Sequence, residues 1–165
     1  MTTSALPPPR SRQSKAQARK GRSRLHNTYS PWAELSTLSD LTLEWRHLTG
    51  RVGEYLHRER KIHLDPRAPR RQLRSVLCHE LRHAEAGDRL THCGRVNLRQ
   101  EQAADQKAAR LMIDVRDLGD AMVLHANHLS AIAVELRVSD ALLRVRRDHL
   151  HPSEKSYLRQ RLADS

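Results

Sequence analysis

Short stretches of alternating apolar and polar residues in the first half of the chain predict β-strands. Leu41–Trp45 alternates in this way and suits a half-buried strand. Val52–His57 and Lys61–Leu64 indicate two further strands that turn around residues 58–60. Together they predict a small antiparallel sheet, and a short helix over Tyr29–Asp40 precedes it.

Apolar residues at three- and four-residue steps predict a helix over Arg71–Asp88, where the repeating positions are Leu73, Val76, Leu77, Leu81 and Ala84. Pro66 or Pro69 suits the first turn of this helix, and Gly87 supplies a stop. The sheet is therefore expected to lead directly into this helix.

The rest of the chain also favours helices. Arg89–Leu98 contains Gly94 and few periodic residues, which is typical of a loop, and a helical pattern resumes from Arg99 to about Val115. Leu118–Leu162 indicates three or four short helices, including a helix, tight turn and helix in which Ser139 is a good N-cap. The predicted fold class is α+β: a small antiparallel sheet packed on two helices, followed by a C-terminal helical bundle that resembles a helix-turn-helix.

Charge separates the N-terminus from the rest of the chain. Residues 1–26 contain seven of the basic residues and no acidic one, so the net charge of +11 falls to +4 for residues 27–165. We interpret 1–26 as a disordered basic tail, 27–116 as the folded core and 117–165 as a helical segment packed on it. Residues 10–24 allow weak contact with nucleic acid, although a plain solvated tail explains them equally well.

Composition excludes several classes of protein. No apolar run approaches the length of a membrane span and no secretory segment follows the N-terminus, so we expect a cytoplasmic protein without membrane contact. The two cysteines, Cys78 and Cys93, do not form a disulfide framework or a four-cysteine zinc site. Cys78 precedes a histidine and is interpreted as a core residue.

The predicted helix over Arg71–Asp88 contains the motif HExxH. On a helix His79 and His83 lie one turn apart on the same face, so both imidazoles can reach one cation. Glu80 is placed to take a proton from a water molecule at that cation. By composition alone the motif would arise in roughly a few per cent of such chains, and the alternative is a surface helix with solvated side chains.

A third ligand is expected on the next helix. Glu101, Ala104, Asp105, Ala108, Leu111 and Met112 share one face of it. The alanines allow close helix packing, so Glu101 can reach a metal on the neighbouring helix. Asp105, one turn further on, is a candidate to accept the second N–H of His79 or His83. A solvated Asp105, or one paired with Lys107 or Arg110, is the alternative.

Some assignments stay open at this point. His92, nine residues after His83, is the rival third ligand if a loop brings it back. Tyr55, His92 and His125 are unranked candidates to stabilise an oxyanion, and an ordinary structural place is an alternative for each.

The segments HELRH and EQAADQKAARLM resemble the ImmA/IrrE family of metallopeptidases, and GEYLHRERKIHLD is similar to the strands that precede the motif in that family. The resemblance spans about residues 41–162. Three departures are Arg82 for a frequent Gly, Lys107 for a frequent Phe, and Ile113-Asp114 for a usual Pro. The resemblance implies cleavage of a helix–turn–helix repressor that controls a mobile element or a stress response.

The expected function is therefore that of a zinc-dependent endopeptidase. Zn²⁺ would be held by His79, His83 and Glu101, with Glu80 as the base. Mn²⁺ or Fe²⁺ are alternatives, because two imidazoles and one carboxylate do not select zinc strongly. The rival hypothesis is a DNA-associated regulatory protein that uses the basic tail and the C-terminal helices, with a metal site that is not catalytic.

Overall fold

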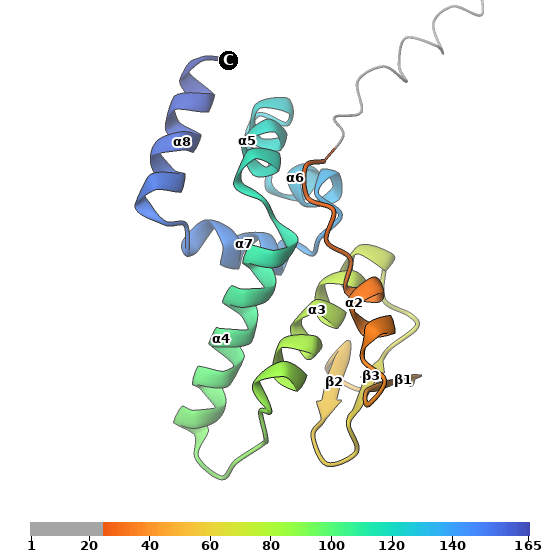
Figure 1. Cartoon of the computed structure of the whole chain (residues 1–165). Helices are drawn as coiled ribbons and strands as arrows, with labels where there is room; N and C mark the ends of the chain where they lie inside the picture. The colour runs from red at the N-terminus through yellow and green to blue at the C-terminus, as the bar shows by residue number, and fades with distance from the viewer. Residues whose placement is uncertain (1–24) are drawn as a thin grey trace, which may run out of the picture.

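The computed structural model describes residues 25–165 (Figure 1). Nearly all of the predicted tail, residues 1–24, lies outside the described residues. In chain order the elements are α2 (Pro31–Thr37), β1 (Thr42–Trp45), β2 (Gly53–Leu56), β3 (Lys61–Leu64), α3 (Arg70–Ala86), α4 (Gly94–Met112), α5 (Val115–Leu124), α6 (Leu129–Glu135), α7 (Asp140–Asp148) and α8 (Pro152–Ala163). The α+β class is confirmed.

The sheet is mixed, so the prediction of an antiparallel sheet was wrong for one strand. The strand order is β1-β3-β2, in which β2 is antiparallel to β3 and β1 is parallel to it. An alternating pattern gives the faces of a strand but not its direction. The central place belongs to β3, whose Ile62, His63 and Leu64 are buried, while residues of β1 are mostly exposed. The connection between β1 and β2 carries the chain past β3, which leaves β1 parallel to it.

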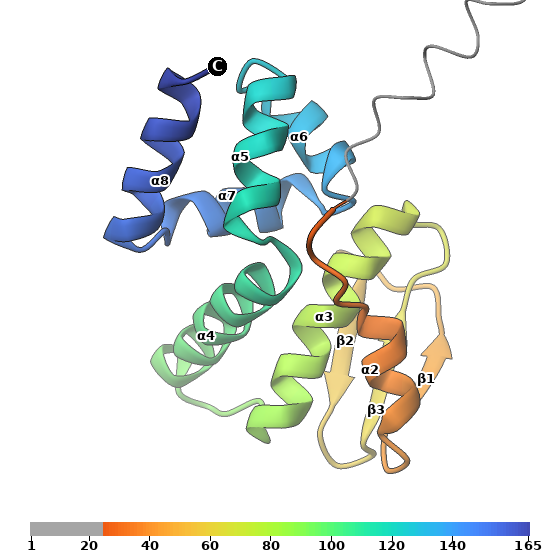
Figure 2. The same ribbon diagram turned by 45° about the horizontal axis from the view of Figure 1, so that its top comes forward.

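Helix α3 lies between the sheet and α4 (Figure 2). Pro69 occupies its N-cap, and Gly87 ends it in the left-handed conformation with φ of 69°. Leu73, Leu77 and Leu81 are buried in a core shared with Ile62 and Leu64 of β3. The central element of the fold is therefore the helix that contains the HExxH motif.

Helix α4 begins five residues earlier than predicted, at Gly94 rather than Arg99. Periodicity missed this start because Val96 and Leu98 are 40% and 57% exposed, so the first turns have no apolar face. The preceding loop is fixed by Asn97, whose side chain binds the backbone N–H and C=O of Thr91 at 2.9 Å each. The loop between α3 and α4 is consequently short and ordered.

Four helices follow, at the upper limit of the prediction. Ser139 caps α7 through Leu142 N–H at 3.1 Å, and Pro152 lies in the first turn of α8, as the sequence predicted. One apolar core joins Cys78 of α3, Ala108 and Met112 of α4, and residues of α5 to α8. The boundary at residue 116 stays a prediction. No helix within residues 25–165 combines the length and the apolar character that crossing a membrane requires.

Candidate metal centre

Helices α3 and α4 bring two imidazoles and one carboxylate to a common point. Nε2 of His79 and Nε2 of His83 are 2.9 Å apart. Glu101 Oε2 lies 3.2 Å from the first and Glu101 Oε1 lies 3.4 Å from the second. One ligand atom from each of the three residues falls within 4.8 Å of the others. The side chains that the sequence predicted to share a cation therefore lie together.

Each imidazole is held from behind by a carboxylate. Nδ1 of His79 is 2.9 Å from Asp105 Oδ1, which is one of the two contacts for which the sequence made Asp105 a candidate. Nδ1 of His83 is 2.8 Å from Asp88 Oδ2, a contact that sequence reasoning missed. An ionised carboxylate can only accept, so each Nδ1 is the donor and each Nε2 keeps its lone pair. Two lone pairs that face one point form the donor arrangement that a divalent cation requires.

The sequence contained a signal for Asp88. It directly follows Gly87, whose positive φ ends α3 and turns the chain back over the last helical turn. The N–H of Asp88 then donates to the carbonyl of His83 at 3.0 Å, which brings its side chain beside that ring. An acidic residue directly after the glycine that ends the helix could therefore have indicated this contact with His83.

The electrostatics of the centre fit a cation. Burial alone would lower the pKa of His79, but the hydrogen bond to Asp105 and the charges of Glu80, Asp105 and Glu101 outweigh it and raise that pKa. Glu101 is the most open of the three, with 59% of its side chain exposed, whereas the His79 and His83 side chains are 17% and 9% exposed. The two imidazoles are therefore shielded from solvent, whereas the Glu101 carboxylate is accessible to it.

Glu80 is buried, with 6% exposure, beside the motif histidines. Burial raises the pKa of its carboxyl, while the charges of His79 and His83 oppose the shift. Its carboxylate lies under β2 at Gly53, where a Cβ would come within 3.3 Å of Glu80 Oε1 and 2.4 Å of Val76 Cγ1. A side chain at position 53 would collide with Val76 and crowd Glu80, so the bare backbone of Gly53 allows β2 to lie this close to α3.

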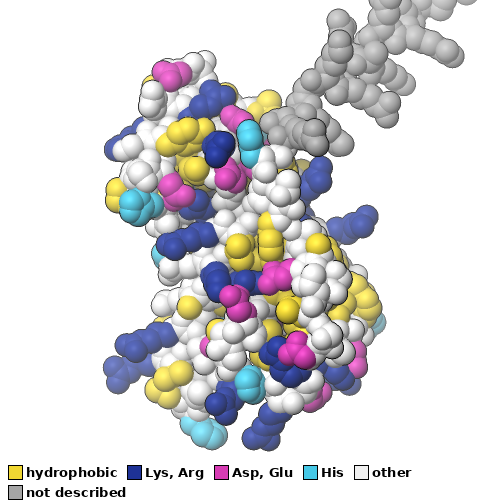
Figure 3. Space-filling view, viewed as in Figure 1, with side chains coloured by type: hydrophobic (Ala, Val, Ile, Leu, Met, Phe, Trp, Pro, Cys, Tyr) yellow, Lys and Arg dark blue, Asp and Glu magenta, His cyan; other side chains and the backbone are white. Residues whose placement is uncertain are grey.

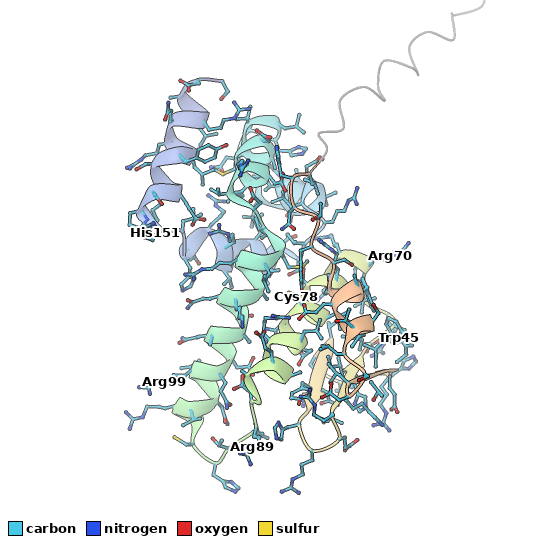
Figure 4. The ribbon with its side chains drawn as sticks, in the orientation of Figure 1. Trp45, Arg70, Cys78, Arg89, Arg99 and His151 are labelled. Atoms are coloured by element: carbon cyan, nitrogen blue, oxygen red, sulfur yellow. The ribbon has the colours of Figure 1, made fainter. Side chains whose placement is uncertain are left out.

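A cavity of about 510 Å³ opens over the centre. It is lined by His79, Glu80, His83 and Glu101 together with β2, the residues just after α3, and Asn97 and Gln100 of α4. Figure 4 labels Arg89, which lies in the connection between α3 and α4 and is one of the residues that line this cavity. The candidate ligands and Glu80 therefore line one cavity that is large enough for part of a peptide.

The rival third ligand and the candidates for oxyanion stabilisation lie outside the group of three ligands. His92 is exposed in the loop before α4 and does not belong to the group of ligating atoms found within residues 25–165. Tyr55 lines the cavity, and its hydroxyl accepts a hydrogen bond from Arg60 Nη1 at 2.7 Å. His125 caps the C-terminus of α5, 3.6 Å from Glu135. Of these three, Tyr55 alone borders the cavity.

Departures from the family pattern point away from the centre. The Arg82 guanidinium donates to the carboxylates of Glu34 and Glu85, on the side of α3 that faces α2. Lys107 Nζ donates to Glu85 at 2.6 Å rather than to Asp105. Cys78, labelled in Figure 4, is a core residue as predicted, and burial raises the pKa of its thiol to about 11. The departures at Arg82 and Lys107 leave the three candidate metal ligands unchanged.

Comparisons with known proteins add one finding. Residues 41–147, which contain the sheet, α3, α4 and the helices up to α7, match the family model described as Peptidase_M78, IrrE N-terminal-like domain. No curated protein and no solved structure matches the chain.

Proposed function

The chain belongs to the Peptidase_M78 family of ImmA/IrrE metallopeptidases, and on this premise we propose that it is a zinc-dependent endopeptidase in which Glu80 is the general base. The observation that carries the proposal is the convergence of His79 Nε2, His83 Nε2 and the Glu101 carboxylate. Two histidines and one glutamate are a ligand set of catalytic zinc sites, which keep a further position open. Mn²⁺ and Fe²⁺ remain alternatives to zinc in this set.

In the proposed mechanism His79, His83 and Glu101 would hold the ion, and Asp105 and Asp88 fix the two rings. A zinc ion held there would supply Lewis acidity to the peptide carbonyl and to the attacking water. Glu80 takes a proton from the attacking water and delivers it to the leaving amine. The raised pKa of Glu80 suits this role, because a carboxyl that binds its proton more tightly is a stronger base at neutral pH.

Strand β2 offers a place for an extended substrate. It pairs with β3 on one side only, and its residues Gly53 to Leu56 line the cavity. Asp65 N–H donates to Val52 O at 2.8 Å, so the alternation of the antiparallel ladder turns the N–H and C=O of Gly53 and Tyr55 to the open edge. A peptide added to that edge would pass over Glu80 and the metal centre. We propose an extended segment of a helix–turn–helix repressor as this peptide.

The test is incubation of the metal-loaded protein with a helix–turn–helix protein encoded beside it. Glu80→Gln should retain one equivalent of metal and lose about 10²- to 10⁴-fold in cleavage rate, the contribution of a general base. Glu59→Gln, on the exposed turn between β2 and β3, is the matched control and should cleave normally. Cleavage by Glu80→Gln at the wild-type rate would remove the proposal.

A further inference from the structure

A second cavity, of about 310 Å³, opens on the other side of the same metal centre. It lies between the start of β2, α3 and α7, and it shares His79, Glu80 and Glu101 with the larger cavity. The metal centre therefore lies between two hollows. A peptide whose carbonyl reaches this centre can place a neighbouring side chain in the smaller cavity.

The walls of the smaller cavity are apolar. They are formed by Val52, Val76, Ala141, Leu142 and Val145. Two serines also line it, but both have partners. Ser75 Oγ donates to Arg71 O at 3.1 Å and accepts from Ser139 N–H at 2.8 Å, while Ser139 Oγ accepts from Leu142 N–H at 3.1 Å. An acidic group inside these walls would lose its hydration without compensation.

Carboxylates also line the smaller cavity. Glu80, Glu101 and Asp105 belong to its lining, and each belongs to the metal centre. An acidic substrate side chain would meet these three carboxylates, so it is disfavoured by charge as well as by desolvation. Among uncharged side chains, an apolar one matches the apolar walls best.

Helix α7 holds its wall of the cavity in a fixed position. Arg71 Nη1 of α3 donates to Val138 O at 3.0 Å and to Asp140 Oδ1 at 2.6 Å, at the start of α7. Further along, Arg146 Nε donates to Ile113 O at 3.0 Å, just after α4. Residues of α3 and from the end of α4, the two helices that supply the candidate ligands, thus hold α7 in position. Because this wall of the cavity is fixed before binding, it discriminates more sharply between substrate side chains.

We infer that α7 supplies the specificity pocket of this protein: Ala141 and Val145 help to bind an apolar substrate side chain adjacent to the scissile bond. The inference rests on the proposed peptidase function. It also gives the helix-turn-helix-like segment a task other than DNA readout, because Ala141 and Val145 of α7 line a cavity that also includes His79, Glu80 and Glu101.

The pocket is tested by binding, independently of cleavage. The probes are peptide hydroxamates, in which the hydroxamate group binds the metal. One series has glycine, leucine or aspartate directly before the hydroxamate, and the other has the same three residues directly after it. Calorimetric titration of the zinc-loaded protein should show, in one series, leucine binding about 10- to 200-fold tighter than glycine, and aspartate weaker than glycine. Equal affinity for leucine and glycine in both series would overturn the inference.

Variants locate the effect. Ala141→Phe fills the pocket from an exposed helical position, so it should remove the leucine advantage and keep the affinity for the glycine compound. Ala141→Leu is the milder alternative if folding suffers. Ala103→Phe, at an exposed position of α4 that lines neither cavity, is the matched control and should keep the advantage. A leucine advantage that survives in Ala141→Phe would overturn the assignment to α7.

Failure of the pocket and failure of the peptidase function give different results. Preference for leucine without Glu80-dependent cleavage would support the pocket and contradict the proposed function. Glu80-dependent cleavage without any preference in either series would support the function and overturn the pocket. No binding of the glycine hydroxamates to zinc-loaded protein would contradict both.

Discussion

The carboxylate of Asp88 lies 2.8 Å from Nδ1 of His83, in the turn that ends the motif helix. Asp105 of α4 has the same relationship to His79, at 2.9 Å. The two rings are therefore fixed by carboxylates from different elements, one from the end of α3 and one from the neighbouring helix. The turn at Gly87 is consequently part of the metal centre.

Removal of either carboxylate should weaken metal binding. Asp88→Ala and Asp105→Ala free the Nδ1–H of one ring, so ring orientation and ligand basicity fall, and we expect about 10- to 100-fold lower metal affinity for each. Competition with a chromogenic chelator measures this. Asp148→Ala, an exposed aspartate at the end of α7, is the matched control. Wild-type affinity in both site variants would contradict the role given to them.

Gly53→Ala should destabilise the protein and disturb Glu80. The added Cβ would lie 2.4 Å from Val76 Cγ1 and 2.9 Å from Leu64 Cδ2, so β2 and α3 must separate, at a cost of about 1–3 kcal/mol in unfolding free energy. Urea unfolding measures the loss, and cleavage should fall with it. Gly94→Ala meets nothing within 4 Å and should leave stability nearly unchanged. Equal urea midpoints for Gly53→Ala and Gly94→Ala would show that β2 and α3 do not pack tightly at Gly53.

Acid should weaken the contact between α7 and α8. Arg146 is buried and donates to Glu154 at 3.0 Å, and this hydrogen bond lowers the pKa of Glu154 to about 2 from an ordinary 4.5. Because the folded-state pKa is depressed, the stabilisation is complete above pH 4.5 and is lost as pH falls toward 2. Glu154→Gln should therefore cost about 2 kcal/mol at pH 7. Unfolding curves of both proteins should converge near pH 2, and a constant difference across that range would refute the linkage.

Deletion of residues 1–24 should leave metal content and cleavage unchanged, because the candidate ligands and Glu80 lie within residues 41–147. On the face shown in Figure 3, Lys and Arg side chains are spread over both halves of the molecule rather than gathered in one patch. Duplex affinity at low salt, if present, should fall on deletion and lose much of its salt dependence. Cleavage that requires the deleted residues would contradict this division of roles.

The motif carried most of what the sequence could predict. His79 and His83 are four residues apart on one helix, so their common face follows from helix geometry alone. Glu101 followed from the pattern of small residues on α4, where Ala104 and Ala108 are buried and allow the close approach. These features depend on local periodicity, which the sequence records directly.

Features that depend on tertiary neighbours were missed. The parallel pairing of β1 with β3 depends on where the 46–52 connection runs, and no local pattern encodes it. The apolar wall from α7 lies more than 60 residues after His79 in the sequence, so its closeness to that residue appears only in the folded chain. Arg82 departs from the family pattern directly before His83, yet its guanidinium contacts Glu34 on the side of α3 that faces α2.

The central claim is that one ion is shared by two helices. Anomalous diffraction at the zinc edge from crystals of the zinc-loaded protein tests it most directly. We predict one strong peak, about 2.0–2.2 Å from His79 Nε2, His83 Nε2 and a Glu101 carboxylate oxygen. A peak ligated by other residues, or none between α3 and α4, would contradict the claim.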